Sequence, residues 1–178
     1  MILSDRELRA RLEDGSIGID PLDDLEAQLQ PASFDLRLGR TFRRLSERGD
    51  SGIELMAPCA ELVLRPGDFA LGTTYERVRV PPELAARVEG RSSFGRLGLL
   101  VHATAGFIDP GFEGEITLEL ANLGPRPVYL RPGSRVCQIV FHTMTSAAQR
   151  PYGPARGSKY SGQTGPTPSR LGEEEREV

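Results

Sequence analysis

Alternation of apolar and polar residues runs through most of the chain and predicts a protein built mainly of β-strands. Over 34–38, three apolar residues alternate with Asp35 and Arg37, which is the period of a strand with one buried and one wet face. Further short strands are expected at 75–80, 85–90, 115–121 and 136–142. Many short strands at close spacing favour a closed or sandwiched all-β domain.

Near the N-terminus the pattern is helical instead. Ser4 and Glu7 have the spacing of a capping box, in which each side chain bonds a free N–H group at the start of a helix. Leu8 and Leu12 then share one helical face, and Gly15 can end the helix. The sequence therefore predicts a short helix from about residue 5 to residue 13.

A partial internal repeat marks two strand–turn–strand units. The segments LVLRPGDFALG (62–72) and VYLRPGSRVCQ (128–138) each carry Arg-Pro-Gly between two apolar stretches. Pro followed by Gly is typical of a type II turn, because Gly takes a positive φ at little cost. Residues 46–60, which are rich in Gly, Asp, Ser and Pro, are expected to form a loop.

The composition changes at about residue 146, where Gly, Ser, Pro, Gln and Tyr replace aliphatic residues. We expect a β domain with its N-terminal helix over 1–145, a C-terminal segment over 146–170 and a disordered acidic tail over 171–178.

Composition also narrows the class of protein. With 38% hydrophobic and 26% charged residues, the 178-residue chain is expected to be one globular domain with tails. No apolar run has the length of a membrane span and the N-terminus lacks a secretory pattern, so a cytoplasmic protein without membrane partners is expected. The net charge of -3 argues against a nucleic-acid partner. Cys59 and Cys137 are expected to be reduced and buried.

Three sparse residue types bear on the chemistry. The two histidines, His102 and His142, and the two distant cysteines do not form the H-x-E and C-x-x-C pattern of zinc deaminases, so no zinc site is expected. Lys159 is the only lysine among 22 basic residues. Its place reflects either chance or the need for a compact ammonium group.

The segment EGRSSFGRLG (89–98) has the composition of a phosphate-binding loop. Arg91, Ser92, Ser93 and Arg96 place two guanidinium groups and two hydroxyls within six residues, among glycines. The alternative is a solvated turn with two surface arginines.

Two acidic residues follow this loop. Asp109 lies in the turn GFIDPGFEG, where a carboxylate either bonds its own backbone or meets a ribose hydroxyl or a water. Glu119 shares one face of a predicted strand with Thr117. That face is either wet or lines a pocket in which a partly desolvated glutamate can act as a general base.

Together these residues resemble the dCTP deaminase branch of the dUTPase-like superfamily over nearly the whole chain. The resemblance is carried by MILSDRELR, QPASFDLRL, GRSSFGRLGLLVHATAGFIDPGFEGEITLEL and RPYGPARGSKYSGQTGPTPSR. It implies an all-β, distorted β-barrel or jelly-roll-like fold of the dUTPase type, with a short N-terminal helix. It also implies a mobile C-terminal tail that closes over bound nucleotide.

The resemblance implies a hydrolytic, metal-independent attack on cytosine C4 of dCTP. By resemblance, Glu119 is the base and proton shuttle, while Ser92, Arg96 and the carbonyl of Ala105 position the water. Asp109 would meet the deoxyribose. Arg91, Ser92, Ser93 and Gln138 would hold the phosphates. The other nucleotide-binding positions that it implies are Phe94, Gly95, Thr117, Leu118, Tyr152, Lys159, Tyr160 and Gln163.

The pair Gly106-Phe107 is similar to the pair in bifunctional family members, which continue to dUMP and pyrophosphate. In that subgroup Asp109 would help a second water attack the α-phosphate. The resemblance further implies Mg²⁺ bound mainly through the nucleotide triphosphate. It also implies a homotrimer whose subunits share active sites.

Three alternatives stay open from the sequence. A monofunctional deaminase would release dUTP. A simple dUTPase would not need Glu119 as a base and normally has Tyr where Phe112 stands. A nucleotide-sensing module on the same fold would not need Glu119, Ser92 and Arg96 together.

Overall fold

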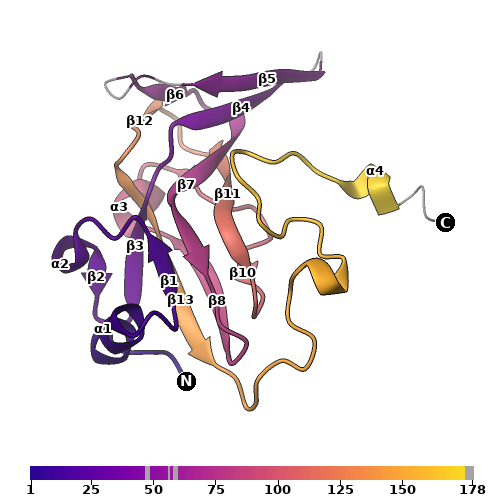
Figure 1. Ribbon diagram of the computed structural model, residues 1–178. Coiled ribbons are helices and arrows are strands. Elements are labelled where there is room, and N and C mark those ends of the chain that lie inside the picture. The colour runs from indigo at the N-terminus through magenta and orange to yellow at the C-terminus, as the bar shows by residue number, and fades with distance from the viewer. Residues whose placement is uncertain (47–48, 56, 58–59, 175–178) are drawn as a thin grey trace.

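The computed structural model describes residues 1–46, 49–55, 57 and 60–174. Two antiparallel sheets face each other and enclose a hydrophobic core (Figure 1). The sheets do not close into a barrel, so the jelly-roll-like form of the predicted all-β fold is the one that describes the molecule.

The sheets are antiparallel throughout. The first has the order β5 (Gly49–Leu55), β4 (Thr41–Ser46), β7 (Phe69–Arg79), β11 (Glu113–Asn122) and β9 (Leu99–Leu100), with β1 (Gly18–Asp20) paired to β7. The second has the order β10 (Phe107–Ile108), β8 (Leu84–Gly90), β13 (Arg135–Thr143), β3 (Ser33–Arg37) and β2 (Leu29–Gln30). A third pair joins β6 (Leu62–Leu64) to β12 (Val128–Leu130). The strands predicted at 75–80, 85–90, 115–121 and 136–142 are confirmed as β7, β8, β11 and β13.

Helices are few and short among the described residues. They are α1 (Asp5–Glu13), α2 (Leu25–Gln28), α3 (Ser92–Gly95), α4 (Leu171–Glu174) and a 3-10 turn, η1 (Pro154–Arg156). No helix in the part of the chain that the structure describes is long and apolar enough to cross a membrane.

The core forms where the inner faces of the two sheets meet. Phe34 and Leu36 of β3 are fully buried, as are Leu118 and Leu120 of β11 and Phe141 of β13. Burying each of these side chains contributes about 1.5–3 kcal/mol. Because β11 presents its even-numbered residues to this core, its odd-numbered residues point the other way.

Both Arg-Pro-Gly segments form the predicted turns. Gly67 and Gly133 each have a φ of +83°, and the residue after each glycine donates its N–H to the carbonyl of the arginine, at 2.9 Å for Asp68 and 3.1 Å for Ser134. The strands that enter the two turns, β6 and β12, pair with each other. The internal repeat therefore brings its two copies side by side.

Helix α1 has the predicted bounds, but the predicted capping box is wrong. Ser4 makes no side-chain cap hydrogen bond. The first N–H groups of the helix find other acceptors: Asp5 donates to the carbonyl of Pro31 at 3.0 Å, and Arg6 donates to Oδ1 of Asp5 at 2.8 Å. These contacts remove the need for the serine hydroxyl.

The loop predicted over 46–60 is wrong over residues 49–55, which form β5 and pair with β4. β5 lies at the edge of its sheet and needs backbone partners on one side only. Small and polar residues are tolerated at such an edge, which hides the strand from a pattern-based prediction.

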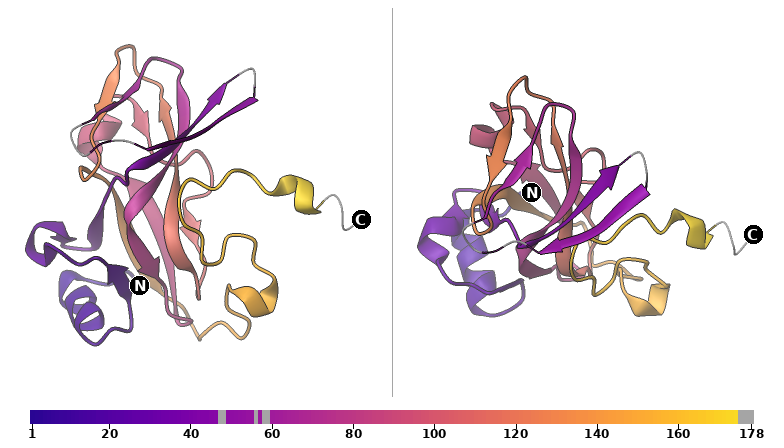
Figure 2. Two further views of the ribbon diagram at one scale, coloured as in Figure 1. Left: turned by 45° about the horizontal axis from the view of Figure 1, so that its top comes forward. Right: turned by 90° about the horizontal axis from the view of Figure 1, so that it is seen from above.

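The C-terminal segment leaves β13 and runs along the start of β11 (Figure 2). Tyr152 donates its N–H to Pro110 at 2.7 Å, Gly162 to Glu113 at 2.8 Å, and Glu115 to Gln163 at 3.0 Å. Helix α4 occupies 171–174, where a disordered tail was expected, and residues 175–178 lie outside the described residues. Disorder of the acidic end stays a prediction.

Cys137 is free and fully buried in β13, as the sequence predicted, whereas Cys59 lies outside the described residues. Burial raises the pKa of the Cys137 thiol, so little reactive thiolate forms near neutral pH.

In a Cys59→Ser variant we expect no labelling by a thiol reagent in the native state and one labelled thiol after unfolding in denaturant. Rapid labelling of the native variant at pH 8 would contradict the burial of Cys137.

Candidate functional site

The carboxylate of Glu119 is held in place by the segment that follows β9. The main-chain N–H of Glu119 donates to Val101 at 3.0 Å, and its Oε2 accepts the N–H of Ala103 at 2.6 Å. A carboxylate that accepts a main-chain N–H keeps one orientation, with its other oxygen available to a ligand.

Thr117 lies on the same face of β11 as Glu119, and both side chains are half-buried. The Oγ1 atom of Thr117 is buried and has no hydrogen-bond partner among the described residues. A buried hydroxyl without a partner costs free energy, and a bound ligand can supply the missing bond. Of the two alternatives that the sequence left open for this face, the partly enclosed one fits the burial.

Within the segment from His102 to Phe107, Gly106 lies directly against the imidazole ring of His102. A Cβ on Gly106 would lie 2.7 Å from Cε1 of the His102 ring, so the glycine leaves room for the imidazole. Gly106 is buried, whereas Ala105 is exposed and 60% of Phe107 is exposed. No role was predicted for His102, which lies against Gly106, the first residue of the pair predicted to decide bifunctionality.

Asp109 begins a tight turn with Pro110 and Gly111. Gly111 has a φ of +89°, and Phe112 donates its N–H to the carbonyl of Asp109 at 3.1 Å. The Asp109 side chain is exposed and makes no hydrogen bond or ion pair with the described residues. The turn is therefore closed by the backbone, which leaves the carboxylate available to a ligand.

Helix α3 presents its polar side chains to solvent. Its single turn is closed by hydrogen bonds such as that from the N–H of Gly95 to Arg91 at 3.0 Å, and Phe94 packs against the core. Ser92, Ser93 and Arg96 are exposed, and their side chains have no partner among the described residues. These are the residues that the sequence proposed as a phosphate-binding loop.

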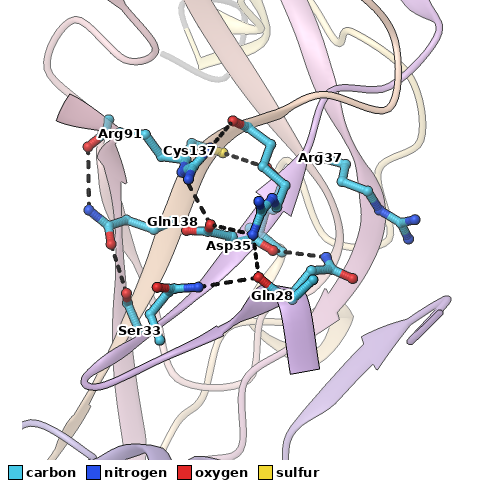
Figure 3. Close-up of polar contacts among 12 residues, drawn as sticks. Gln28, Ser33, Asp35, Arg37, Arg91, Cys137 and Gln138 are labelled. Carbon is cyan, nitrogen blue, oxygen red and sulfur yellow. Dashed lines mark hydrogen bonds and ion pairs between the residues drawn. The ribbon is translucent and has the colours of Figure 1, made fainter. Parts of the chain in front are cut away.

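Unlike Ser92, Ser93 and Arg96, Arg91 has side-chain partners among the described residues. Its Nε lies 3.1 Å from Oδ2 of Asp35, and its Nη1 donates to the carbonyl of Arg135 at 2.9 Å (Figure 3). Gln138, the other predicted phosphate contact outside α3, accepts a hydrogen bond from Ser33 at 2.7 Å. Strand β3 thus contacts both predicted phosphate-binding side chains.

The predicted wet face of β3 is wrong, because Asp35 is only 2% exposed. Both faces of β3 are covered, one by the core and the other by ion pairs with Arg91 and Arg135. Burial raises the pKa of the Asp35 carboxyl, and the two guanidinium groups oppose that rise. Sequence reasoning assigned Asp35 no function.

The predicted residues of the C-terminal segment lie beside the Asp109 turn. The ring of Tyr152 packs 6.1 Å from that of Phe112, and the Tyr152 hydroxyl accepts the N–H of Tyr160 at 3.0 Å. Gln163 donates from Nε2 to the carbonyl of Glu115 at 2.8 Å. The carbonyl of Lys159 accepts a hydrogen bond from the guanidinium of Arg170.

The structure gathers the predicted residues in two places. The C-terminal segment contacts the Asp109 turn and the start of β11, whereas Glu119 lies farther along β11 beside residues 101–103. Helix α3 lies on the opposite side of the molecule from the C-terminal segment (Figures 1 and 2). Within the described residues, no hydrogen bond or ion pair joins Ser92 or Arg96 to Glu119. The Leu118 side chain is fully buried, which leaves only its main chain for a ligand.

No group of three or more His, Cys, Asp or Glu side chains is arranged to hold a metal ion in the part of the chain that the structure describes. The phosphate-facing candidates are guanidinium, hydroxyl and amide groups, which suit an anion. These residues fit a nucleotide that brings its own cation.

Known proteins are similar to this chain over most of its length. Residues 2–144 match the family model described as dCTP deaminase-like. Two relatives are each 54% identical over 185 residues, covering 96% of this chain and 95% of their own: the dCTP deaminase of Natronomonas pharaonis and the dCTP deaminase, dUMP-forming, of Halobacterium salinarum. The crystal structure of 2′-deoxycytidine 5′-triphosphate deaminase from Agrobacterium tumefaciens is similar at a TM-score of 0.64 and 27% identity, covering 80% of this chain and 48% of that chain.

Proposed function

The chain belongs to the dCTP deaminase-like family, and we propose from this premise that it deaminates dCTP and then hydrolyses the resulting dUTP to dUMP and pyrophosphate. The observation that carries the first step is the fixed carboxylate of Glu119 beside the buried hydroxyl of Thr117, which has no hydrogen-bond partner among the described residues. A held base and an unsatisfied polar group on one half-buried face suit the recognition of a polar ring.

In the proposed deamination, Glu119 takes a proton from water as the water oxygen attacks cytosine C4. Glu119 then passes that proton to ring N3, and the remaining hydroxyl proton moves to the amino group. Ammonia leaves as the C4–N bond breaks and the C4 carbonyl forms. Ser92, Arg96 and the carbonyl of Ala105 would position the water. Arg91, Ser93 and Gln138 would hold the phosphates, with Mg²⁺ carried on the triphosphate.

The second proposed step replaces the bond between the α- and β-phosphates of dUTP by a bond to water. Asp109 is suited to assist that water, because its carboxylate is exposed and has no partner among the described residues, on a turn closed by a main-chain hydrogen bond. Gly106 and Phe107 are the pair that resembles bifunctional family members.

We further propose that complete sites form between subunits of a homotrimer. Of the residues proposed to hold phosphates, Ser93 lies on α3 and Arg91 directly precedes it, whereas Tyr152, Lys159, Tyr160 and Gln163 lie in the C-terminal segment on the opposite side. A site that needs both groups is supplied by α3 of one subunit and the C-terminal segment of another. This arrangement also accounts for the exposed polar side chains on α3, which have no partner among the described residues.

The alternative function is a deaminase that releases dUTP. It is favoured by the relative from Natronomonas pharaonis, which is as similar as the dUMP-forming one and is named only as a dCTP deaminase. The two functions share the first step and differ only in the product.

Product analysis tests both. With purified protein, dCTP and Mg²⁺, we expect ammonia, dUMP and pyrophosphate to appear together, with little free dUTP. Ammonia with accumulating dUTP would establish the alternative and remove the proposed role of Asp109 in hydrolysis. The absence of ammonia would overturn the deaminase proposal, and added dUTP would then test for a simple dUTPase.

A further inference from the structure

We propose that Ser33 and Asp35 of β3 are positioning residues that hold Gln138 and Arg91 in the orientation in which they receive the nucleotide's phosphates. The inference rests on the proposed function, which gives Arg91 and Gln138 that ligand. It adds a buried layer of residues behind the phosphate site, supplied by a strand that contacts no phosphate itself.

The two positioning residues share the polar face of β3. They stand at alternate positions, while Phe34 between them is buried in the core. Ser33 is 6% exposed and Asp35 is 2% exposed, so neither side chain can reach a ligand directly. Each can affect nucleotide binding only through the side chain that it contacts, which is Gln138 for Ser33 and Arg91 for Asp35.

Asp35 and a main-chain carbonyl contact two different nitrogens of the Arg91 guanidinium. Oδ2 of Asp35 lies 3.1 Å from Nε, and the carbonyl of Arg135 accepts from Nη1 at 2.9 Å. No described residue accepts a hydrogen bond from Nη2. Because the guanidinium is planar, fixing two of its nitrogens fixes the direction of the remaining donors.

Ser33 sets the orientation of the Gln138 amide in the same way. Its hydroxyl donates to Oε1 of Gln138 at 2.7 Å, while Nε2 has only a long contact of 3.4 Å to the carbonyl of Gly90. The amide therefore presents its N–H donors away from Ser33. Phosphate oxygens accept hydrogen bonds. The contacts of Asp35 with Arg91 and of Ser33 with Gln138 therefore both leave N–H donors available to a phosphate.

Asp35 is itself anchored to its surroundings. Arg135 Nη1 lies 3.4 Å from Oδ2 of Asp35 and also donates to the carbonyl of Ala27. Gln28 Nε2 donates to the main-chain carbonyl of Asp35 at 2.9 Å. A buried carboxylate is costly unless it is paired, and two guanidinium groups meet that need here. The long Arg91 side chain is then ordered before the nucleotide arrives, which lowers the entropy cost of binding.

The chain contains a matched control for this inference. Glu76 of β7 is fully buried and pairs with Nε of Arg37 at 2.6 Å. Gln28 links it to the Asp35 backbone, since Nε2 also donates to Oε1 of Glu76 at 2.9 Å. Replacing Glu76 by Gln makes the same chemical change as replacing Asp35 by Asn, but it touches no residue proposed to bind phosphate.

The test compares Asp35→Asn with Glu76→Gln in steady-state kinetics with dCTP and Mg²⁺, using inorganic triphosphate as a competing probe. For Asp35→Asn we expect the KM for dCTP and the Ki of triphosphate to rise together by about tenfold, with kcat within about threefold of wild type. For Glu76→Gln we expect a lowered Tm but a KM and a Ki within about twofold. A role confined to stability would lower the Tm of both variants and leave KM and Ki unchanged in both.

Ser33→Ala removes one hydroxyl and is a second test of the inference, which can be used if Asp35→Asn does not fold. We expect it to raise the KM by about threefold, and to add nothing in a Gln138→Ala background, because it acts through Gln138. Wild-type KM values in folded Asp35→Asn and Ser33→Ala, in an enzyme that turns over dCTP, would overturn this inference alone. A wild-type protein that neither binds nor deaminates dCTP would overturn the proposed function and this inference with it.

Discussion

Replacing Glu119 by Gln is expected to slow ammonia release from dCTP by about a thousandfold while dCTP binding stays within a few-fold of wild type. The Oε2 of Glu119 accepts the N–H of Ala103 at 2.6 Å, and a glutamine can offer its amide oxygen to the same donor. The side chain therefore keeps its position but loses the capacity to take a proton from water. Single-turnover ammonia release and calorimetric titration with dCTP measure the two quantities separately.

Glu113→Gln is the matched control for this experiment. Glu113 lies on the same strand and the same face, but its carboxylate is exposed and pairs with Arg77 at 3.2 Å. We expect this variant to release ammonia at the wild-type rate. If Glu119→Gln also turned over normally, the base would have to be another residue; if it lost dCTP binding as well, Glu119 would be a binding group and not the proton shuttle.

The parts of the fold that follow from local chemistry could be predicted from the sequence. The Arg-Pro-Gly turns at 65–67 and 131–133 form because Pro and Gly prefer the required φ angles whatever surrounds them. The range of α1 follows from its apolar period. The hydroxyl of Ser4 was misjudged because capping depends on competing acceptors, and Pro31, which comes from a distant turn, takes the N–H of Asp5.

The candidate site shows the same division between local and tertiary information. Glu119 and Thr117 could be predicted to share a face, since a strand alternates, but their half-burial depends on the segment at 101–103. Asp35 could not be assigned from its pattern, because an aspartate that alternates with core residues is ordinarily exposed. The guanidinium groups that cover it come from α3's flank and from β13, more than 50 residues away. Only the folded chain brings them to it.

The second large effect is expected at Asp109. Asp109→Asn should lower dUMP formation by about a hundredfold or more and leave ammonia release within about tenfold, so that dUTP becomes the main product. Asparagine matches the shape of aspartate and can still bond a deoxyribose hydroxyl, but it cannot accept the proton of a water that attacks the α-phosphate. Because the turn is closed by the Asp109 carbonyl and by Gly111, the substitution leaves the backbone as it is. Chromatographic separation of dUTP from dUMP over time measures the change.

Asp68→Asn provides a control at a comparable position, because Asp68 ends the first Arg-Pro-Gly turn and its carboxylate accepts the N–H of Arg65 at 2.8 Å. We expect it to keep the wild-type ratio of products. Loss of ammonia release and dUMP together in Asp109→Asn would mean that Asp109 serves nucleotide binding in both steps. An unchanged product ratio would assign the second water to another group, and the division of labour between the two carboxylates would fail. The expected shift from dUMP to dUTP would instead tie each hydrolytic step to its own carboxylate, one fixed on β11 and one on an exposed turn.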